Sequence, residues 1–236
     1  PCRVCRRYAP MHRGVADLFH LVMSNPLTLT DDRLEQYIES HISPEPDHLK
    51  RLYRHTWLHH LYPRMCSGHL QGRILKMLTS MIAPKRVLEL GTFTGYSTLC
   101  IAEGLQPGAT LDTVEIDDEM DDELRERFAD YPSITLHIGD AAEVVGRMPG
   151  EWDMVFVDAD KRRYPEYLAM LKPRMARGGY ILADNTLWSG RVVADDAGRD
   201  PQLRGILEFN RLVAEDPELE SVIFPLRDGL SLIKRL

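Results

Sequence analysis

The chain has 236 residues, with a hydrophobic content of 44%, a charged content of 28% and a formal net charge of −7 at pH 7. These values are typical of a globular α/β protein, and the negative charge disfavours an extended nucleic-acid surface. No apolar run approaches the roughly 18 residues of a membrane span, so no membrane partner is expected. The four cysteines do not suggest a disulfide framework, which favours a cytoplasmic location.

The first 22 residues differ from the remainder of the chain. They begin with a basic stretch that has no hydrophobic periodicity, PCRVCRR, and Met23 stands shortly before the first helical pattern. We therefore expect residues 1–22 to be an extension that neither the fold nor the chemistry needs. Residues 23–236 are expected to form a single domain.

Three amphipathic helices are expected before the first strand, because apolar residues recur at helical spacing over residues 30–42, 47–62 and 67–82. His59 and His60 are adjacent in the second of these helices. Neighbouring side chains on a helix point in different directions, so we do not expect the two histidines to form a joint metal site.

After residue 82 the pattern changes to short apolar strands that alternate with helices. The predicted strands are 86–91, 110–116, 134–139, 152–158 and 179–185, and the predicted helices are 96–104, 118–130, 141–147, 163–175 and 202–214. This alternation is typical of a doubly wound parallel sheet with helices on both faces. In the tail, LESVIFPL and GLSLIKRL flank Asp228 and Gly229, which predicts an antiparallel hairpin. The expected fold class is α/β, Rossmann-like, with extra N-terminal helices.

Acidic residues occur at the carboxyl end of each of the five predicted parallel strands. They are Glu89, Glu115, Asp140, Asp158 with Asp160, and Asp184. Ligands of open α/β sheets bind beyond the carboxyl ends of the strands. Helix capping explains one or two acids at such positions, whereas acids at all five ends indicate a binding site.

The stretch VLELGTFTGYS, residues 87–97, predicts a turn that brings the backbone close to a ligand. Its glycines, Gly91 and Gly95, do not have the spacing of a dinucleotide fingerprint, and Glu89 precedes them. A carboxylate there suits an ammonium or a sulfonium-bearing amino acid better than a phosphate. Glu115, at the tip of the next strand, is placed to accept the hydroxyls of a ribose. The pattern favours S-adenosylmethionine as the cofactor.

A second constellation consists of Asp158, Asp184 and Asn185, which offer only hard oxygen donors. Such donors suit Mg²⁺, or another divalent cation such as Mn²⁺ or Ca²⁺. Lys161 follows Asp158 by three residues and is a candidate general base. A surface lysine and an Asx turn after a strand are the alternatives for Lys161 and for the Asp184-Asn185 pair.

These motifs resemble a known family. The segments VLELGTFTGYS, TVEID, IGDAAE, WDMVFVDADKRRYPEY and GGYILADNTLWSGRV are similar to the cation-dependent class I O-methyltransferases, which include catechol and caffeoyl-CoA O-methyltransferases. The resemblance covers about residues 30–236. It implies a seven-stranded sheet whose last strand is antiparallel, a phenolic small-molecule acceptor and, we expect, a homodimer.

The resemblance also implies roles for individual residues. The cofactor would be held by Ser67, Glu89, Gly91, Thr92, Ser97, Glu115, Asp140, Ala141, Asp158 and Asp160. The cation would be bound by Asp158, Asp184 and Asn185, with Lys161 as general base and Asp158 sharing in catalysis. Trp188 and Ser189 would line the acceptor pocket, where plant members carry asparagine in place of Ser189.

Three other functions stay open at this point. A tRNA methyltransferase that acts on hydroxylated uridine is the nearest, since several arginines between residues 51 and 73 could form a basic patch despite the negative net charge. A nicotinamide-dependent dehydrogenase would need a different glycine spacing. A non-enzymatic binding module would leave Lys161 and the acidic residues unexplained.

Overall fold

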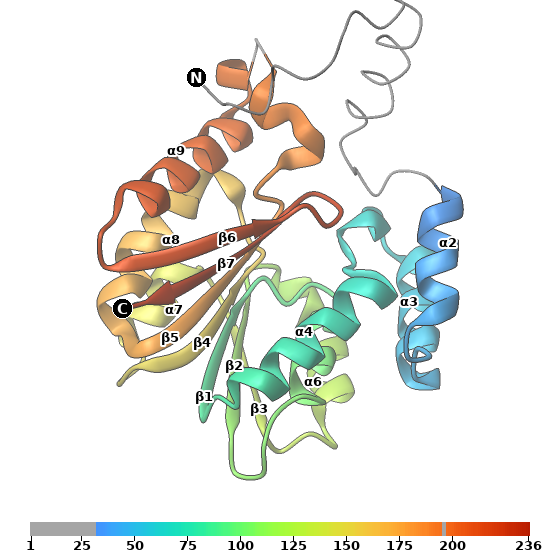
Figure 1. Cartoon of the computed structure of the whole chain (residues 1–236). Coiled ribbons are helices and arrows are strands. Elements are labelled where there is room, and N and C mark those ends of the chain that lie inside the picture. The colour runs from blue at the N-terminus through green and yellow to red at the C-terminus, as the bar shows by residue number, and fades with distance from the viewer. Residues whose placement is uncertain (1–31, 195–196) are drawn as a thin grey trace, which may run out of the picture.

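The structure, a computed structural model, describes residues 32–194 and 197–236. Within them lies a seven-stranded sheet of order β3-β2-β1-β4-β5-β7-β6 (Figure 1). Its strands are β1 (Arg86–Leu90), β2 (Thr110–Glu115), β3 (Ile134–Ile138), β4 (Trp152–Val157), β5 (Met175–Asp184), β6 (Leu219–Phe224) and β7 (Leu230–Arg235). The first five are parallel, and β7 runs antiparallel to both β5 and β6. The predicted sheet and its antiparallel tail are therefore confirmed.

Helices cover both faces of this sheet. One face packs on α7 (Ala141–Arg147), α8 (Tyr164–Leu171) and α9 (Pro201–Glu215). The other packs on α3 (Asp47–His59), α4 (Gly68–Ile82), α5 (Tyr96–Ala102) and α6 (Asp121–Phe128), and α2 (Asp32–His41) lies outermost beside α3 (Figure 1). Two separate buried clusters result, one on each face, as a doubly wound sheet requires.

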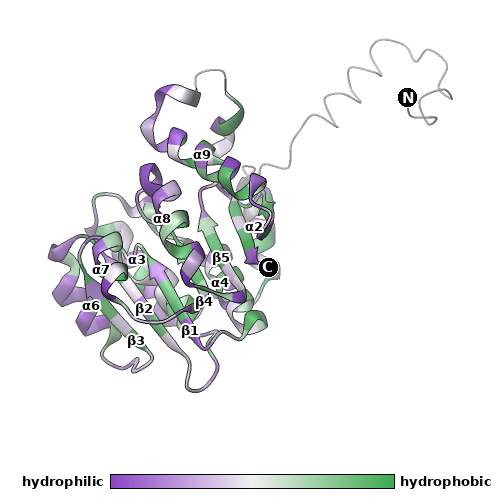
Figure 2. Ribbon diagram, turned by 90° about the vertical axis from the view of Figure 1, so that its left-hand side faces the viewer, coloured by the Kyte–Doolittle hydropathy of each residue, from purple (hydrophilic) through white to green (hydrophobic). Residues whose placement is uncertain are grey.

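The central strands are apolar because both of their faces are covered. In β1, Val87 packs on the α5 side, whereas Leu88 and Leu90 pack on the α8 side. In β4, Trp152 and residues 154–157 are all at most 1% exposed. Burying one large side chain contributes roughly 1.5–3 kcal/mol. Figure 2 shows the hydrophobic strands in the middle and hydrophilic outer surfaces on helices such as α6 and α7.

Several predicted boundaries are wrong by a few residues. The helix predicted over 47–62 ends at His59, after which a short 3₁₀ segment covers Pro63–Met65. The helix predicted over 163–175 ends at Leu171, because Pro173 cannot donate the next helical hydrogen bond. The fifth strand begins at Met175, four residues before its predicted start at 179.

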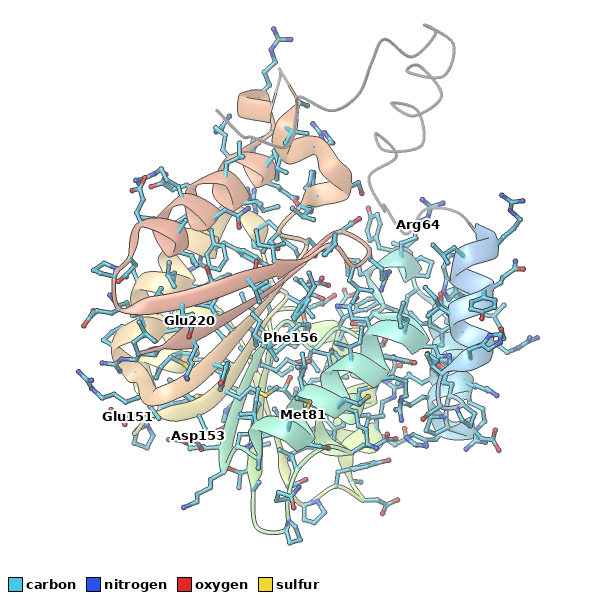
Figure 3. All side chains as sticks on the ribbon, viewed as in Figure 1. Arg64, Met81, Glu151, Asp153, Phe156 and Glu220 are labelled. Atoms are coloured by element: carbon cyan, nitrogen blue, oxygen red, sulfur yellow. The ribbon has the colours of Figure 1, made fainter. Side chains whose placement is uncertain are left out.

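The two ends of the sheet differ in what they carry. Figure 3 labels Asp153 near the start of β4, where its carboxylate accepts hydrogen bonds from the backbone of Lys85 and Arg86. The opposite end of the sheet, where the parallel strands finish, lies toward the turn between β6 and β7 and toward the segment that contains Arg64 (Figures 1 and 3). The predicted site residues lie at this carboxyl end. Among the described residues, no helix has the length and apolar character that crossing a bilayer needs.

The predicted extension, residues 1–22, lies outside the described residues, and so does the proposed domain start at Met23. The homodimer and the cytoplasmic location stay predictions.

The backbone of Lys161 passes very close to Gly205 in α9. A Cβ atom added to Gly205 would lie 2.1 Å from the carbonyl oxygen of Lys161 and 2.8 Å from Cα of Arg162. Both neighbours are backbone, so neither moves away easily. Only glycine lets α9 pack against the segment that holds Lys161.

We expect Gly205→Ala to lower the free energy of unfolding by roughly 1–3 kcal/mol, the usual cost of overpacking. Urea denaturation measures this. Gly146→Ala is the matched control, because Gly146 also lies in a helix but faces open space, where alanine stabilises by roughly 0.5–1 kcal/mol. Equal stability of the two variants would contradict the close packing at Gly205.

Candidate active site

The glycine turn after β1 brings the ends of β1 and β4 into contact. Gly91 has φ of 100°, and a Cβ there would lie 2.4 Å from the carbonyl oxygen of Asp158. Gly95 has φ of 79° and packs against the ring of Phe128. Both glycines therefore have a conformational and a steric reason within the protein itself, and the approach of this turn to a ligand stays a prediction.

Glu115 ends β2 with its carboxylate fixed by backbone amides. Phe93 N–H donates to Oε2 at 2.6 Å, and Ile116 and Asp117 N–H groups donate to Oε1 at 2.9 and 3.0 Å. Glu115 is 8% exposed. A carboxylate accepts about four hydrogen bonds, so capacity remains on Oε2 for a ligand hydroxyl beside the glycine turn.

Glu89 lies inside the protein, on the α5 face of β1, and is 0% exposed. Three hydroxyls donate to its carboxyl group: Ser97 at 2.6 Å, Thr98 at 2.5 Å and Thr113 at 2.7 Å. Thr92 is joined to the same group through the hydroxyl of Thr113, 2.6 Å away. Burial raises the pKa of Glu89 to about 7, although the three hydroxyls oppose the shift. The network ties the glycine turn and α5 to β1 and β2.

Asp158 and Asp184 lie at the ends of neighbouring strands, β4 and β5. Lys161 Nζ donates to Asp158 Oδ1 at 2.6 Å, and both side chains are largely buried, at 13% and 15% exposed. Burial first, and then the negative charge of Asp158, raise the pKa of the Asp184 carboxyl to about 6. The hydroxyl of Tyr164 lies 3.0 Å from the carbonyl oxygens of both Val157 and Asp184 and so joins the two strand ends.

The loop after β5 holds Asn185, Trp188 and Ser189, all with left-handed φ of 59°, 45° and 51°. The turn between β6 and β7 supports this loop. Trp188 N–H donates to the carbonyl of Asp228 at 3.0 Å, and Ser189 Oγ donates to the Asp228 carboxylate at 2.7 Å. The loop therefore depends on the C-terminal hairpin for its unusual backbone.

Asp140 and Asp160 are engaged with the protein itself. Asp140 caps α7, in which Ala141 is the first and buried residue, and its carboxylate pairs with the Arg163 guanidinium, which is the chief cause of its lowered pKa. Asp160 caps the 3₁₀ segment of Lys161 and pairs with Arg162, which lowers its pKa. Neither arginine partner was predicted from the sequence.

Gln71 and Arg227 join the two sides of the site and were missed in the sequence. Gln71 Nε2 donates to Asp184 Oδ2 at 2.7 Å. Arg227 donates to Gln71 Oε1 at 2.9 Å and also to the carbonyl of Ser67. Gln71 is a polar residue on the buried face of α4, which it shares with Leu75 and Thr79. The position of this polar residue on an apolar helix face is the feature of the sequence that could have indicated its role.

A cavity of about 760 Å³ opens beside these residues, between α2, α3, α4 and the β6–β7 turn. Its lining includes Glu39, Glu45, Lys50, Tyr53, Ser67 and Arg227. Arg227 thus faces this cavity while it contacts Gln71, the partner of Asp184.

The fold is of the Rossmann-like α/β class, with a glycine turn beside the carboxylate of Glu115 and two acids at adjacent strand ends. A model of the O-methyltransferase family matches residues 39–236. The chain belongs to this family.

Individual relatives agree with the family. The chain is 33% identical to caffeoyl-CoA O-methyltransferase 2 of Populus trichocarpa, over 92% of this chain and 94% of that one. Its fold is similar to that of the SAH-bound methyltransferase PaMTH1 of Podospora anserina, with a TM-score of 0.79, 26% identity and coverage of 97% and 98%. The fold is also similar to that of the O-methyltransferase TomG of Streptomyces achromogenes in complex with SAM, with a TM-score of 0.77 and 26% identity, over 86% of this chain and 96% of that one. The predicted membership of the class I S-adenosylmethionine O-methyltransferases is confirmed.

The raised pKa of Glu89 predicts a pH-dependent stability. The folded-state pKa of Glu89, about 7, lies above the ordinary value of 4.5, so the folded protein binds this proton more tightly than the unfolded chain does. The stability that this proton contributes is complete below pH 4.5 and is lost as the pH rises through 7. Glu89→Gln stays neutral at every pH. We expect its free energy of unfolding to fall less than that of the natural protein between pH 5 and 8, by roughly 1–3 kcal/mol.

Urea denaturation at several pH values gives this difference. Glu143→Gln, an exposed change on α7 with a side chain 71% exposed, is the control and should run parallel to the natural protein. A parallel course for Glu89→Gln as well would mean that the buried carboxyl does not titrate in this range.

Proposed function

We propose that this enzyme transfers the methyl group of S-adenosylmethionine to a hydroxyl of a small catechol-like acceptor, with the help of a divalent cation. The observation that carries the proposal is the pair of acids at the ends of β4 and β5. Asp184 is buried beside Asp158, and the charge of one raises the pKa of the other. Of these two acids, Asp158 is the one that accepts a hydrogen bond from Lys161.

The donor set fits a hard cation. The side chains of Asp158, Asp184 and Asn185 offer only oxygen ligands, which Mg²⁺ prefers. A cation would also favour the ionised form of Asp184, which is disfavoured by its burial beside Asp158. When bound, a divalent cation supplies Lewis-acid stabilisation of negative charge on the acceptor oxygen. Gln71 would orient Asp184 from the other side through its 2.7 Å hydrogen bond.

The cofactor fits the neighbouring turn. Glu115, beside the glycine turn, has hydrogen-bonding capacity for a ribose hydroxyl. Glu89, with Ser97 and Thr92 in its network, would support the turn at the methionine end from within the protein. The SAM- and SAH-bound structures of similar fold support this assignment. Asp140, Ala141 and Asp160 would contribute to the cofactor site near the starts of their helices.

The acceptor would enter beside Trp188 and Ser189 and extend toward the cavity that Arg227 and Tyr53 line. Similar curated proteins are named for action on caffeoyl-CoA, which supports a phenolic acceptor. Lys161 would take the proton of the reacting hydroxyl, since it is held at the strand end by Asp158 and by the packing of Gly205.

We expect catechols or caffeoyl esters to be methylated in the presence of Mg²⁺ and labelled S-adenosylmethionine. A chelator should abolish turnover, and Mg²⁺ or Mn²⁺ should restore it, because the two acids then lose and regain their counter-charge. Asp158→Asn should weaken Mg²⁺ binding measured by calorimetry, whereas Asp112→Asn, on β2 and paired with His137, should not.

Full turnover in excess chelator would contradict the cation proposal. Unmodified and hydroxylated tRNA belong in the same panel. Labelling of hydroxylated tRNA, with none of the phenols, would replace the catechol-like acceptor by the hydroxyuridine of tRNA.

We expect Lys161→Arg and Lys161→Ala both to lower turnover by roughly 10²–10⁴-fold, the usual contribution of a general base. Arginine keeps the positive charge beside Asp158 but does not release a proton, so the two variants separate charge from proton transfer. Cofactor affinity, measured by calorimetry, should change little in either.

Lys172→Arg is the matched control for this pair, because Lys172 forms ion pairs with Asp216 and Glu218. Its turnover should be unchanged. If Lys161→Arg keeps near-normal turnover across the pH range, then Lys161 supplies only charge.

A further inference from the structure

A cluster of two histidines and one glutamate joins α3 to α6, outside the acidic centre. The ligand atoms of His55, His60 and Glu123 all lie within 4.8 Å of one another. His55 Nδ1 is 3.8 Å and His60 Nε2 is 3.6 Å from Oε1 of Glu123. Both distances are too long for a hydrogen bond. Ligands around a tetrahedral metal with bonds of about 2.0–2.1 Å lie about 3.3 Å apart, so a small inward shift completes the site.

The cluster does not include His59, so the expectation that His59 and His60 form no joint metal site is not contradicted. His60 takes part because the helix ends earlier than predicted. His60 follows the last residue of α3 and has ψ of 144°, so its side chain leaves the helical course. The pairing is with His55, five residues earlier, and not with His59. The helical argument for His59 and His60 assumed that the helix continued to Tyr62.

A second observation points to a ligand here. Nε2 of His60 is buried and has no hydrogen-bond partner among the described residues. The ring of His60 is fixed against Phe93, with ring centroids 5.5 Å apart, so the nitrogen is held toward Glu123. A buried polar atom without a partner is destabilising. A metal ion would remove that cost.

We propose that His55, His60 and Glu123 form a second metal site, which takes a divalent transition metal such as Zn²⁺. Imidazole and carboxylate donors suit Zn²⁺, whereas the oxygen-only set at the strand ends suits Mg²⁺.

Arg127 limits the affinity of this site. Its guanidinium donates to Oε1 of Glu123 at 2.7 Å and to the carbonyl of Thr94 at 3.0 Å. Oε1 has a second lone pair for a metal, but the arginine charge repels a cation. The site is therefore one of moderate affinity, filled when metal is present, and not a permanent structural centre.

A metal ion at this site would restrain the glycine turn that follows β1. Phe93 and Thr94 lie between the two metal-bearing helices: Phe93 packs on His60, and Thr94 accepts a hydrogen bond from Thr56 of α3 at 3.0 Å. Phe93 N–H also donates to Glu115. A metal that fixes the end of α3 to α6 would hold the turn between them.

Calorimetric titration of the full chain with Zn²⁺ in excess Mg²⁺ tests the site. We expect one Zn²⁺ per chain, and His55→Ala, His60→Ala and Glu123→Gln should each weaken it by at least roughly 10–100-fold, the loss seen for outer-shell changes alone. His48→Ala is the matched control, on the same helix but 3.3 Å from Glu103, and should keep the affinity. Asp158→Asn should keep it as well, which separates this site from the proposed cation at the strand ends.

Equal Zn²⁺ binding by a His55→Ala, His60→Ala double variant would overturn the proposal. Circular dichroism checks that the variants fold. Should they not, the visible spectrum of Co²⁺ added to the unaltered, Mg²⁺-loaded protein decides. A nitrogen-ligated, low-coordinate Co²⁺ absorbs strongly, and a spectrum of weakly absorbing, oxygen-ligated Co²⁺ alone would overturn the proposal.

Discussion

The close contact between the backbones of Gly91 and Asp158 is the constraint on which the site depends. Asp158 N–H donates to the carbonyl of Leu90 at 2.8 Å, and a Cβ on Gly91 would lie 2.4 Å from the Asp158 carbonyl oxygen. This contact joins the carboxyl ends of β1 and β4 into one continuous surface. The glycine turn, with Glu115 beside it, lies on one side, and the acids with Lys161 lie on the other. Methyl transfer needs donor and acceptor in line at short range, and a side chain at position 91 would push these two halves apart.

Two buried carboxyl groups in this surface are stabilised in different ways. Glu89 accepts hydrogen bonds from three hydroxyls and holds neighbouring elements together. Asp184 accepts one hydrogen bond from Gln71 and one from the backbone of Asn185, and it faces the charge of Asp158. Burial raises the pKa of both. The three hydroxyls around Glu89 donate to it and so stabilise its ionised form in part. Asp184 has fewer donors around it and faces a second negative charge, and that difference supports the proposal that the second acid holds a cation.

Much of this arrangement could be predicted from the sequence, since apolar runs place the strands and the acids follow the runs directly. The parallel sheet and the antiparallel tail follow from the alternation of elements and from the Asp228-Gly229 turn, whereas the strand order was known only from the structure. Contacts made by side chains from distant loops could not be predicted. Ser67 and Arg227, which donates to it, are 160 positions apart in the sequence, so no local pattern indicates their contact. The pairing of His55 with His60 was missed for a different reason: it depends on where α3 ends, and helix ends are the least certain part of a periodic pattern.

The turn between β6 and β7 gives the C-terminal hairpin a role beyond closing the sheet. Arg227 has φ of 48°, a conformation that costs a non-glycine residue energy. In return, its guanidinium reaches Ser67 and Gln71 on α4, while the carbonyl of the next residue, Asp228, accepts from Leu187 and Trp188. One turn thus fixes both the helix that orients Asp184 and the loop that follows Asn185. Because the turn also borders the 760 Å³ cavity, two hydrogen bonds join the wall of that cavity to the acids, from Arg227 to Gln71 and from Gln71 to Asp184.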